Sequence, residues 1–349
     1  MIETESLRKE FRTGGTNLIA RIGRVGRSRR AGVAGRPADA GHAATKTAVD
    51  GLTLAIPPGR VTGLLGLNGA GKTTTIKILA TLLRQTSGTV RVDGLDPLEE
   101  PNAVRRRINL IAGGERMVYA RMTGRENLWY FGQLYDVPRG VLTGRIDELL
   151  ALVGLTGAAD TLVERYSRGM AQRLSIARGL INDPAYLLLD EPTLGLDAPI
   201  ARDLRRVVAR LAREGKGVLL TSHYLTEVEE LCEHVYVIGD GRHLTEGSPA
   251  ELTARTGCHR RVRVTVAGHS PGVESAVAAF AGRLGTAATV ALAENGDMTV
   301  SMSHPDEIAG PLTMAIVDAG GTLAGLTVAE PSLEDAILAL NDEAGLVTA

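Results

Sequence analysis

A glycine-rich loop between an apolar run and a helical pattern constrains this chain more than any other feature. Residues Gly66 to Thr73 match the pattern G-x-x-x-x-G-K-[ST]. The run Val61 to Leu65 predicts a strand before the loop, and Thr74 to Leu83 predicts a helix after it. In this setting backbone N–H groups turn toward a polyphosphate, and the helix N-terminus adds a partial positive charge. A plain turn in a strand–helix unit does not require all three signals, so we expect a nucleotide triphosphate here.

Two side chains of the loop have direct roles in this interpretation. Lys72 reaches the β and γ phosphates, and the Thr73 hydroxyl binds Mg²⁺. The nucleotide-binding residues predicted in this segment are Gly66, Leu67, Asn68, Gly69, Ala70, Gly71, Lys72, Thr73 and Thr74.

Length and composition limit what surrounds the loop. A chain of 349 residues exceeds the usual single core, which favours about two domains. The two cysteines, Cys232 and Cys258, suit a reducing compartment and offer no disulfide framework or metal cluster. The sequence has no run of 18 apolar residues and no secretory signal pattern. We therefore expect the chain itself to be soluble.

A basic segment interrupts the N-terminal part. Residues 12–46 contain eight Lys or Arg, one acid and seven glycines. Such a composition is typical of a solvated insertion. An alternative is a helix lying on an anionic membrane surface, with one apolar face, although two glycines weaken it. That face would consist of Leu18, Ile19, Ile22 and Val25.

Two acids follow an apolar run further along the chain. Tyr186 to Leu189 predicts a buried parallel strand, which delivers Asp190 and Glu191 at its carboxyl end. Open α/β sheets keep their ligands at this edge. Asp190 is placed to organise Mg²⁺, and Glu191 to polarise the attacking water as general base. Two acids before a proline are otherwise a solvated strand end, but the phosphate loop favours the catalytic interpretation.

A histidine follows the next expected strand, Val218 to Leu220. An imidazole at a strand end can stabilise a developing γ-phosphate charge or hold the attacking water in line. A lone histidine is more often structural, so His223 becomes a candidate only because of the two strands before it.

A second anion site is predicted at a helix start. Ser167 and Gly169 precede an apolar-periodic run, and together offer a hydroxyl, free N–H groups and a helix dipole. A single molecule has little use for two γ-phosphate sites on different elements. A dimer can use both, because each copy can supply one of the two sites to the same nucleotide.

These motifs, in this order, resemble the ATP-binding subunits of ABC transporters. The resemblance covers about residues 1–250, and the spacings from Lys72 to Ser167, Ser167 to Asp190 and Asp190 to His223 are 95, 23 and 33 residues. Gly66 to Thr73 is similar to the Walker A loop, and Ser167 to Met170 to the signature motif. Leu187 to Glu191 is similar to Walker B, Leu196 and Asp197 to the D-loop, and His223 to the switch histidine.

The resemblance implies a mechanism and partners. In this family two subunits close head to tail, so that each ATP lies between one Walker A loop and the partner's signature motif. Lys72, Glu191 and His223 are then catalytic, while Asp197 and the pair Ser167 and Gly169 belong to the nucleotide interface. The stretch Thr193 to Asp197 is similar to the corresponding segment in the ATPase subunits of drug-resistance-type exporters. Such a subunit hydrolyses ATP on the cytoplasmic face of the membrane, bound peripherally to a separate integral-membrane permease.

Phe11 matches the position of the family's adenine-stacking aromatic, although an N-terminal strand residue with only a packing role would look the same. Three departures concern other motifs. Arg168 replaces the first signature glycine, and Met170 replaces the usual glutamine. The segment Ile111 to Arg116 contains no Q-loop glutamine, and Glu115 is a candidate for part of that role.

The resemblance and the patterns together predict the architecture. The fold class is α/β, a P-loop ABC ATPase domain over residues 1–250 with a helical subdomain over about 123–170, capped at Thr123. Residues 257–349 form a small α+β domain whose βαββαβ order suggests a ferredoxin-like module, with a last helix from Ser332. This second domain is regulatory or stabilises the dimer.

Two other functions remain open from the sequence. A soluble ABC-type ATPase acting on translation or nucleic acid would use the basic insertion to bind phosphates. Such proteins usually carry two ATPase modules or a long coiled coil. The sequence has neither, which argues against nucleic acid as a partner. A weakly hydrolysing nucleotide-binding regulator would explain the missing glutamine. The transported substrate is not encoded in these motifs.

Overall fold

A computed structural model describes residues 1–13, 44–113, 118–255, 260–293, 296–329, 333, 336 and 337. The chain divides into two compact units, Met1–Glu246 and Gly247–Ala349. The predicted amphipathic face at Leu18 to Val25, together with Glu115 and Cys258, lies outside the described residues.

The first unit is built on a six-stranded sheet with the strand order β5-β6-β7-β3-β8-β9. The pairs β5–β6, β6–β7, β7–β3 and β3–β8 are all parallel. Their ranges are β3 Val61–Leu65, β5 Ile108–Ala112, β6 Tyr186–Asp190, β7 Gly217–Thr221, β8 His234–Gly239 and β9 Arg242–Gly247. Strands β3 and β7 are buried along their whole length, as a parallel sheet covered on both faces requires. The strands predicted before the phosphate loop and before Asp190 and His223 are therefore present in one sheet.

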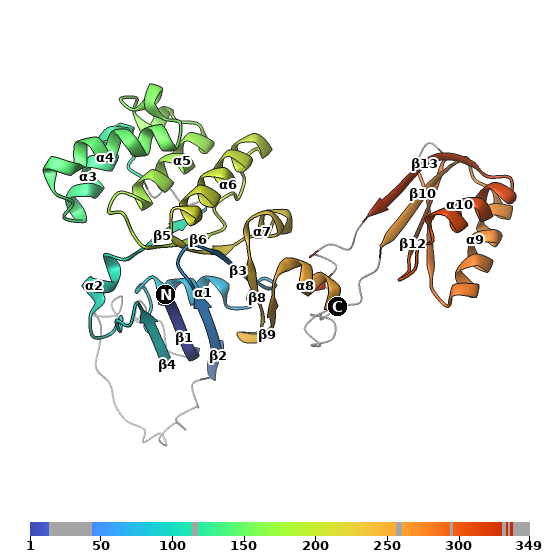
Figure 1. The fold of residues 1–349 in the computed structure, drawn as a ribbon, viewed down its shortest axis with the longest axis horizontal. Helices are drawn as coiled ribbons and strands as arrows, with labels where there is room; N and C mark the ends of the chain where they lie inside the picture. Colours follow the sequence, from blue (N-terminus) through green and yellow to red (C-terminus); the bar gives the residue numbers. More distant parts are fainter. Residues whose placement is uncertain are drawn as a thin grey trace, which may run out of the picture. The chain divides into compact units, whose positions relative to one another are not determined.

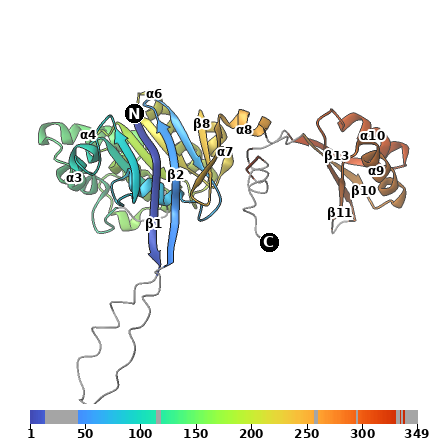
Figure 2. The same cartoon turned by 90° about the horizontal axis from the view of Figure 1, so that it is seen from below.

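A second, antiparallel sheet has the order β2-β1-β4. It consists of β1 Ile2–Thr13, β2 Ala44–Ile56 and β4 Ser87–Val92. Strands β1 and β2 run side by side as a long pair (Figure 2). Their register continues to Thr13 opposite Ala44, so the two ends of the basic segment lie next to each other.

One hydrophobic core joins the two sheets. Apolar side chains of the antiparallel sheet, such as Ile2 and Leu54, share a buried cluster with Leu188 and Leu219 of the parallel sheet. Ile76, which belongs to the helix after the phosphate loop, lies in the same cluster and is fully buried. Each such side chain stabilises the fold by about 1.5–3 kcal/mol. The loop is thus anchored on both sides by core residues.

The helix after the loop differs from the sequence expectation. It spans Lys72–Leu79 as α1, so it begins two residues earlier and ends four residues earlier than predicted. Gly71 precedes it with a φ of 105°, a conformation that favours glycine, which lets the helix begin at Lys72 itself. Thr81 has a φ of 61°, which ends any helical continuation.

The helical region gathers beside β5 and β6 (Figure 1). It contains α3 Gly124–Leu134, α4 Arg139–Leu152 and the start of α5 Arg168–Gly179. The predicted cap is present, because the Thr123 hydroxyl accepts a hydrogen bond from the Glu126 N–H and the Glu126 carboxylate accepts one from the Thr123 N–H. The structure also describes α2 Pro101–Arg105, α6 Ala198–Arg213, α7 Leu225–Leu231 and two short 3-10 helices, Thr156–Ala158 and Val163–Arg165, in this unit.

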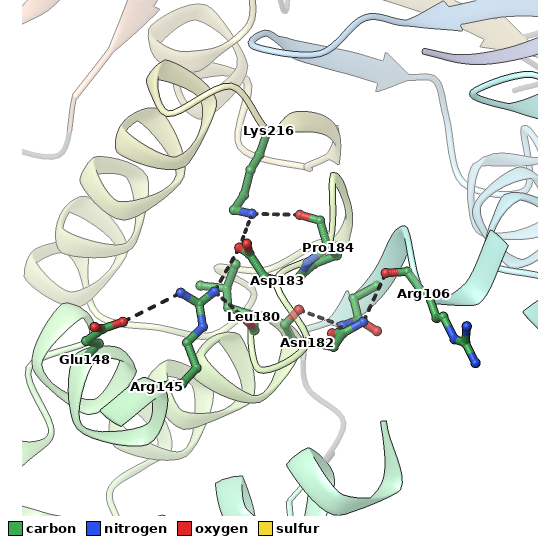
Figure 3. A network of polar contacts seen from close by, with 10 residues as sticks. Arg106, Arg145, Glu148, Leu180, Asn182, Asp183, Pro184 and Lys216 are labelled. Carbon is green, nitrogen blue, oxygen red and sulfur yellow. Dashed lines mark hydrogen bonds and ion pairs between the residues drawn. The ribbon is translucent and has the colours of Figure 1, made fainter. Parts of the chain in front are cut away.

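A polar network ties this helical region to the sheet (Figure 3). Arg145 of α4 lies 3.0 Å from Asp183, in the turn before β6. Lys216, directly before β7, lies 2.8 Å from the same carboxylate and donates a second 2.8 Å bond to the Pro184 carbonyl. Asp183 therefore joins one helix of the subdomain to the entrances of two neighbouring strands.

The second unit contains α8 Pro249–Arg255 and a four-stranded antiparallel sheet. Two helices, α9 Pro271–Leu284 and α10 Ala309–Asp318, alternate with the strands, and their apolar faces share a core with Val264, Val300 and neighbouring residues. The sheet order is β11-β12-β10-β13, formed by β10 Arg261–Ala267, β11 Ala288–Leu292, β12 Met298–Ser303 and β13 Thr322–Ala329. Of the predicted last helix, the structure describes Leu333, Ala336 and Ile337, all helical and buried.

Among the residues that the structure describes, none belongs to a helix long and apolar enough to span a bilayer.

Candidate functional site

The phosphate loop lines a cavity of about 370 Å³. Residues Asn68 to Thr74 form one wall, and Phe11, Lys46, Ala48 and Glu191 complete the lining. Gly66 has a φ of 155°, and a β-carbon at this position would overlap the Ile238 carbonyl oxygen at the end of β8. The loop glycine is therefore required by its close packing against the sheet.

The Lys72 side chain turns back onto the phosphate loop. Its ammonium donates hydrogen bonds to the carbonyl oxygens of Gly66 at 2.7 Å and Leu67 at 3.1 Å. Burial lowers the pKa of Lys72 from its ordinary value, while the negative charges of Glu191 and Asp190 oppose that shift. The cation is thus held in the same electrostatic environment as the two carboxylates predicted to act with it.

Asp190, Thr221 and Ala112 stand in one row across the end of the parallel sheet. The pairing of β5 with β6 sets Ala112 beside Asp190, and the pairing of β6 with β7 sets Asp190 beside Thr221. The Thr221 hydroxyl donates a 2.7 Å hydrogen bond to the Asp190 carboxylate. Sequence reasoning assigned no role to Thr221; the available signal was a hydroxyl at the last position of the neighbouring strand.

Glu191 and His223 come together at this edge. His223 Nε2 lies 2.6 Å from Glu191 Oε1, although the residues leave different strands, β6 and β7. The Glu191 side chain is about one-quarter exposed and that of His223 about two-fifths, so both reach the surface where a water molecule can enter. The arrangement suits a carboxylate general base oriented by an imidazole.

The backbone of Glu191 is strained and firmly held. Its φ is 53°, a left-handed conformation that is uncommon for a residue with a side chain and clusters at functional sites. Its N–H donates to the Thr221 carbonyl at 3.0 Å. A β-carbon at Gly113 would overlap the Glu191 carbonyl oxygen, and the Gly113 N–H donates to the Asp190 carbonyl at 2.7 Å. The glycine at the end of β5 therefore allows the chain to close against Glu191.

Thr73 and Asp190 fit a Mg²⁺ ion bound together with phosphates. Mg²⁺ prefers oxygen ligands, and typically takes one or two from the protein while substrate phosphates and water supply the rest. Across the described residues there is no cluster of three or more His, Cys, Asp or Glu suited to a metal. A hydroxyl and one carboxylate near a phosphate loop match the sparse protein contribution that such an ion requires.

The signature residues lie at a different cavity, of about 410 Å³, lined by Ser167, Arg168, Leu194, Leu196 and others. Ser167 is the N-cap of α5, and its hydroxyl accepts a 3.2 Å hydrogen bond from the Met170 N–H. Gly169 is buried, and a β-carbon there would overlap the Ile200 side chain of α6. Ser167 and Gly169 therefore do not line the phosphate-loop cavity of their own chain.

Arg168, the unusual signature residue, contacts the segment that carries Asp197. Its guanidinium donates a 3.1 Å hydrogen bond to the Leu194 carbonyl, and a β-carbon at Gly195 would overlap it. Asp197 precedes α6 as an exposed residue whose side chain makes no cap hydrogen bond. The predicted signature motif therefore contacts the predicted D-loop segment of the same chain through Arg168.

Phe11 lies at the phosphate-loop cavity despite the basic segment that follows it. Phe11 pairs with Lys46 across β1 and β2, and its side chain is 39% exposed. The Lys9 ammonium lies 5.2 Å from the ring centroid. An exposed aromatic ring beside the loop is available for stacking on a nucleobase.

The comparisons with known proteins all identify ABC transporter proteins or ATP-binding cassettes. Residues 49–194 match the family model described as ABC transporter. The ABC transporter ATP-binding protein NatA of Bacillus subtilis is 42% identical over 205 residues, covering 59% of this chain and 83% of that protein. A fluoroquinolones export ATP-binding protein of Mycobacterium tuberculosis is 42% identical over 234 residues, covering 67% and 75%. A dimeric ATP-binding cassette structure, bound to ADP and phosphate, matches with a TM-score of 0.57 at 22% identity, covering 71% and 98%, which supports the fold.

Proposed function

This chain belongs to the ATP-binding proteins of ABC transporters, and we propose that it hydrolyses ATP between two copies of itself to drive export through a separate permease. The chain is an ABC ATPase of the type found in drug-resistance exporters. The observation that carries the proposal is the convergence of Lys72, Glu191 and His223 from three different elements at one edge of the sheet. Because the relatives are transport proteins, the alternatives in translation or nucleic-acid binding are not favoured.

Each site residue has a role in the proposed reaction. Lys72 and the N–H groups of residues 66–74 bind the β and γ phosphates. Thr73 and Asp190 would hold Mg²⁺, which supplies neutralising charge for the phosphates when bound. Glu191 accepts a proton from the attacking water, and His223 orients that carboxylate and the γ-phosphate. The adenine stacks on Phe11.

The dimer is proposed because the second anion site lies away from the phosphate-loop cavity of its own chain. Ser167 lines a cavity distinct from that of the phosphate loop, and Gly169 follows it by two residues in the first turn of α5. In a head-to-tail dimer, they and Asp197 would face the nucleotide bound by the other copy. Helix α5 then directs its N-terminal dipole at the γ-phosphate.

The permease is proposed to bind at an aromatic surface of the helical region, on the inner face of the membrane. Tyr119, Trp129 and Tyr130 are 49%, 50% and 38% exposed. Tyr119 and Tyr130 pack edge to face, with ring centroids 5.2 Å apart. Only 3% of the chain is aromatic, so this exposed group is unusual for the protein and is typical of a protein interface.

The second unit is proposed to be a ferredoxin-like module that stabilises the dimer or regulates it. The alternation of β10, α9, β11, β12, α10 and β13 supports this assignment, as does the sheet order β11-β12-β10-β13.

Steady-state hydrolysis by the wild type beside Glu191→Gln tests the proposal. We expect the wild type to turn over, and the variant to lose activity while accumulating an ATP-bound dimer in size-exclusion chromatography. Lys72→Ala is the control, since it should lose the nucleotide and remain monomeric. If the wild type neither hydrolyses nor dimerises with ATP and Mg²⁺, the proposal is wrong for the isolated chain.

A further inference from the structure

Glu227 is a buried carboxylate outside the nucleotide-binding motifs. It lies on α7, and only 1% of its surface is exposed. Acidic residues are almost never buried this completely unless they are paired. Its burial therefore calls for a specific set of contacts.

One oxygen of Glu227 joins two separate loops. The Ser222 hydroxyl donates a 2.5 Å hydrogen bond to Glu227 Oε2, and the Thr193 hydroxyl donates a 3.0 Å bond to the same atom. Thr193 follows Glu191 by two residues, and Ser222 immediately precedes His223. The carboxylate thus links the segment that carries the proposed base to the segment that carries the imidazole.

These contacts close a ring around the catalytic pair. Starting from Glu191, the ring passes along the chain to Thr193, through Glu227 to Ser222, along the chain to His223, and back to Glu191 through the 2.6 Å contact. A closed ring of contacts restricts the independent motion of the Glu191 and His223 side chains. The separation of Glu191 and His223 is therefore coupled to a carboxylate that is bonded to the residues beside them, Thr193 and Ser222.

Burial and hydrogen bonding act on the Glu227 carboxyl in opposite directions. Burial raises the pKa of Glu227, while the bonds from Ser222 and Thr193 and the charge of Arg205 oppose the rise. Arg205 of α6 also lies 2.9 Å from Glu230, an exposed carboxylate on the same helix as Glu227. Because both hydroxyls donate to the same buried oxygen, loss of that oxygen leaves two buried donors without an acceptor, which favours the arrangement that keeps the two loops together.

We propose that Glu227 is a positioning residue for ATP hydrolysis, which fixes the distance between Glu191 and His223 by holding Thr193 and Ser222 together. This inference rests on the proposed function. Without the carboxylate, the two hydroxyls lose their shared acceptor. The segments then keep only the bonds at the strand ends, from Thr221 to Asp190 and from the Glu191 N–H to Thr221, beside the contact between Glu191 and His223 itself. The water held by the base would then be misaligned with the γ-phosphate.

Steady-state kinetics of Glu227→Ala and Glu227→Gln provide the test, with Glu230→Ala as the matched control. We expect Glu227→Ala to lower kcat about 10- to 100-fold, because small misplacement of reacting groups has effects of that size. KM and the ATP dissociation constant should stay within about twofold, since the phosphate loop is unchanged. Gln should restore kcat to within about threefold, because an amide oxygen also accepts two hydrogen bonds. Glu230→Ala should behave like the wild type.

A double variant separates positioning from general damage. Adding Glu227→Ala to His223→Ala should lower kcat by less than about threefold more, because the group it positions is already gone. The inference fails if Glu227→Ala keeps wild-type kcat, if Gln does not restore the rate, or if the two effects multiply. Failure of the proposed function looks different, because the wild type itself would then not hydrolyse ATP.

Discussion

His223 Nε2 lies 2.6 Å from Glu191 Oε1, and this contact joins two residues that are separated by 32 positions and leave different strands. The parallel pairing of β6 and β7 brings the two strand ends side by side, with Asp190 opposite Thr221. The imidazole and the carboxylate then extend from adjacent loops toward the same point. A general base held in this way has a defined direction from which it accepts a proton.

Replacing His223 with alanine tests this relationship. We expect His223→Ala to lower kcat about 100-fold or more, since a positioned acid–base group contributes roughly that factor. ATP binding should change little, because His223 does not line the phosphate-loop cavity. Equilibrium binding of a fluorescent ATP analogue and single-turnover hydrolysis measure the two effects separately. Equal losses in binding and turnover would contradict a catalytic role. The control is Tyr224→Phe, which keeps an exposed ring next to the histidine.

The glycine at the end of β5 should be intolerant of a side chain. A β-carbon at Gly113 would overlap the Glu191 carbonyl oxygen, so Gly113→Ala must displace either β5 or the catalytic loop. We expect a loss of about 1–3 kcal/mol in the free energy of unfolding, as for other overpacked sites. We also expect a lower kcat. Thermal denaturation and steady-state hydrolysis measure both effects.

Gly144 of α4 supplies the matched control for that substitution. A β-carbon there would meet no atom within 4 Å. Alanine is favoured over glycine by about 0.8–1.0 kcal/mol inside a helix, so Gly144→Ala should raise stability and leave hydrolysis unchanged. If both variants behaved alike, the close packing at Gly113 would have no functional importance.

The sequence predicted most of this site because its signals are local. The loop glycines, the acids at a strand end and the cap at Thr123 can each be recognised from a few adjacent residues. The structure places Asp190 and His223 at the ends of the expected strands. Thr221 and Gly113 were missed because their roles arise from strand pairing and from backbone contact across loops. Helix α1 was misplaced by two residues at its start, since the left-handed conformation of Gly71 is not visible in a pattern of apolar residues.

Asp93 should make stability depend on acid pH. Its carboxylate accepts 2.6 Å bonds from both Tyr186 and Arg107, and a 2.8 Å bond from the Met1 amino group. Burial acts to raise its pKa, but these donors together outweigh burial and lower the pKa to about 2. The folded state therefore binds the proton less tightly than the unfolded state. Its contribution is complete above about pH 4 and is lost as pH falls toward 2.

Asp93→Asn should remove that dependence. We expect a loss of about 2 kcal/mol in the free energy of unfolding at neutral pH, which shrinks as the pH approaches 2. Fluorescence of Trp129, the single tryptophan, reports unfolding of this unit in urea at each pH. Asp203→Asn, which alters an exposed carboxylate on α6, is the control. A constant difference between Asp93→Asn and wild type across the whole range would contradict the linkage.

Trp129 should report on the permease as well as on folding. Its side chain is half exposed on α3, beside Tyr130, and the phosphate-loop cavity does not include it. Interface aromatics often contribute about 2 kcal/mol or more to binding, so Trp129→Ala should reduce recovery of the chain with its co-expressed permease by several-fold. Hydrolysis by the isolated chain should stay within about twofold of wild type. Leu82→Ala removes a 66% exposed apolar side chain after α1 and serves as the control. Equal recovery of wild type and Trp129→Ala would show that the aromatic surface is not the permease contact, and would leave the nucleotide site and its chemistry unaffected.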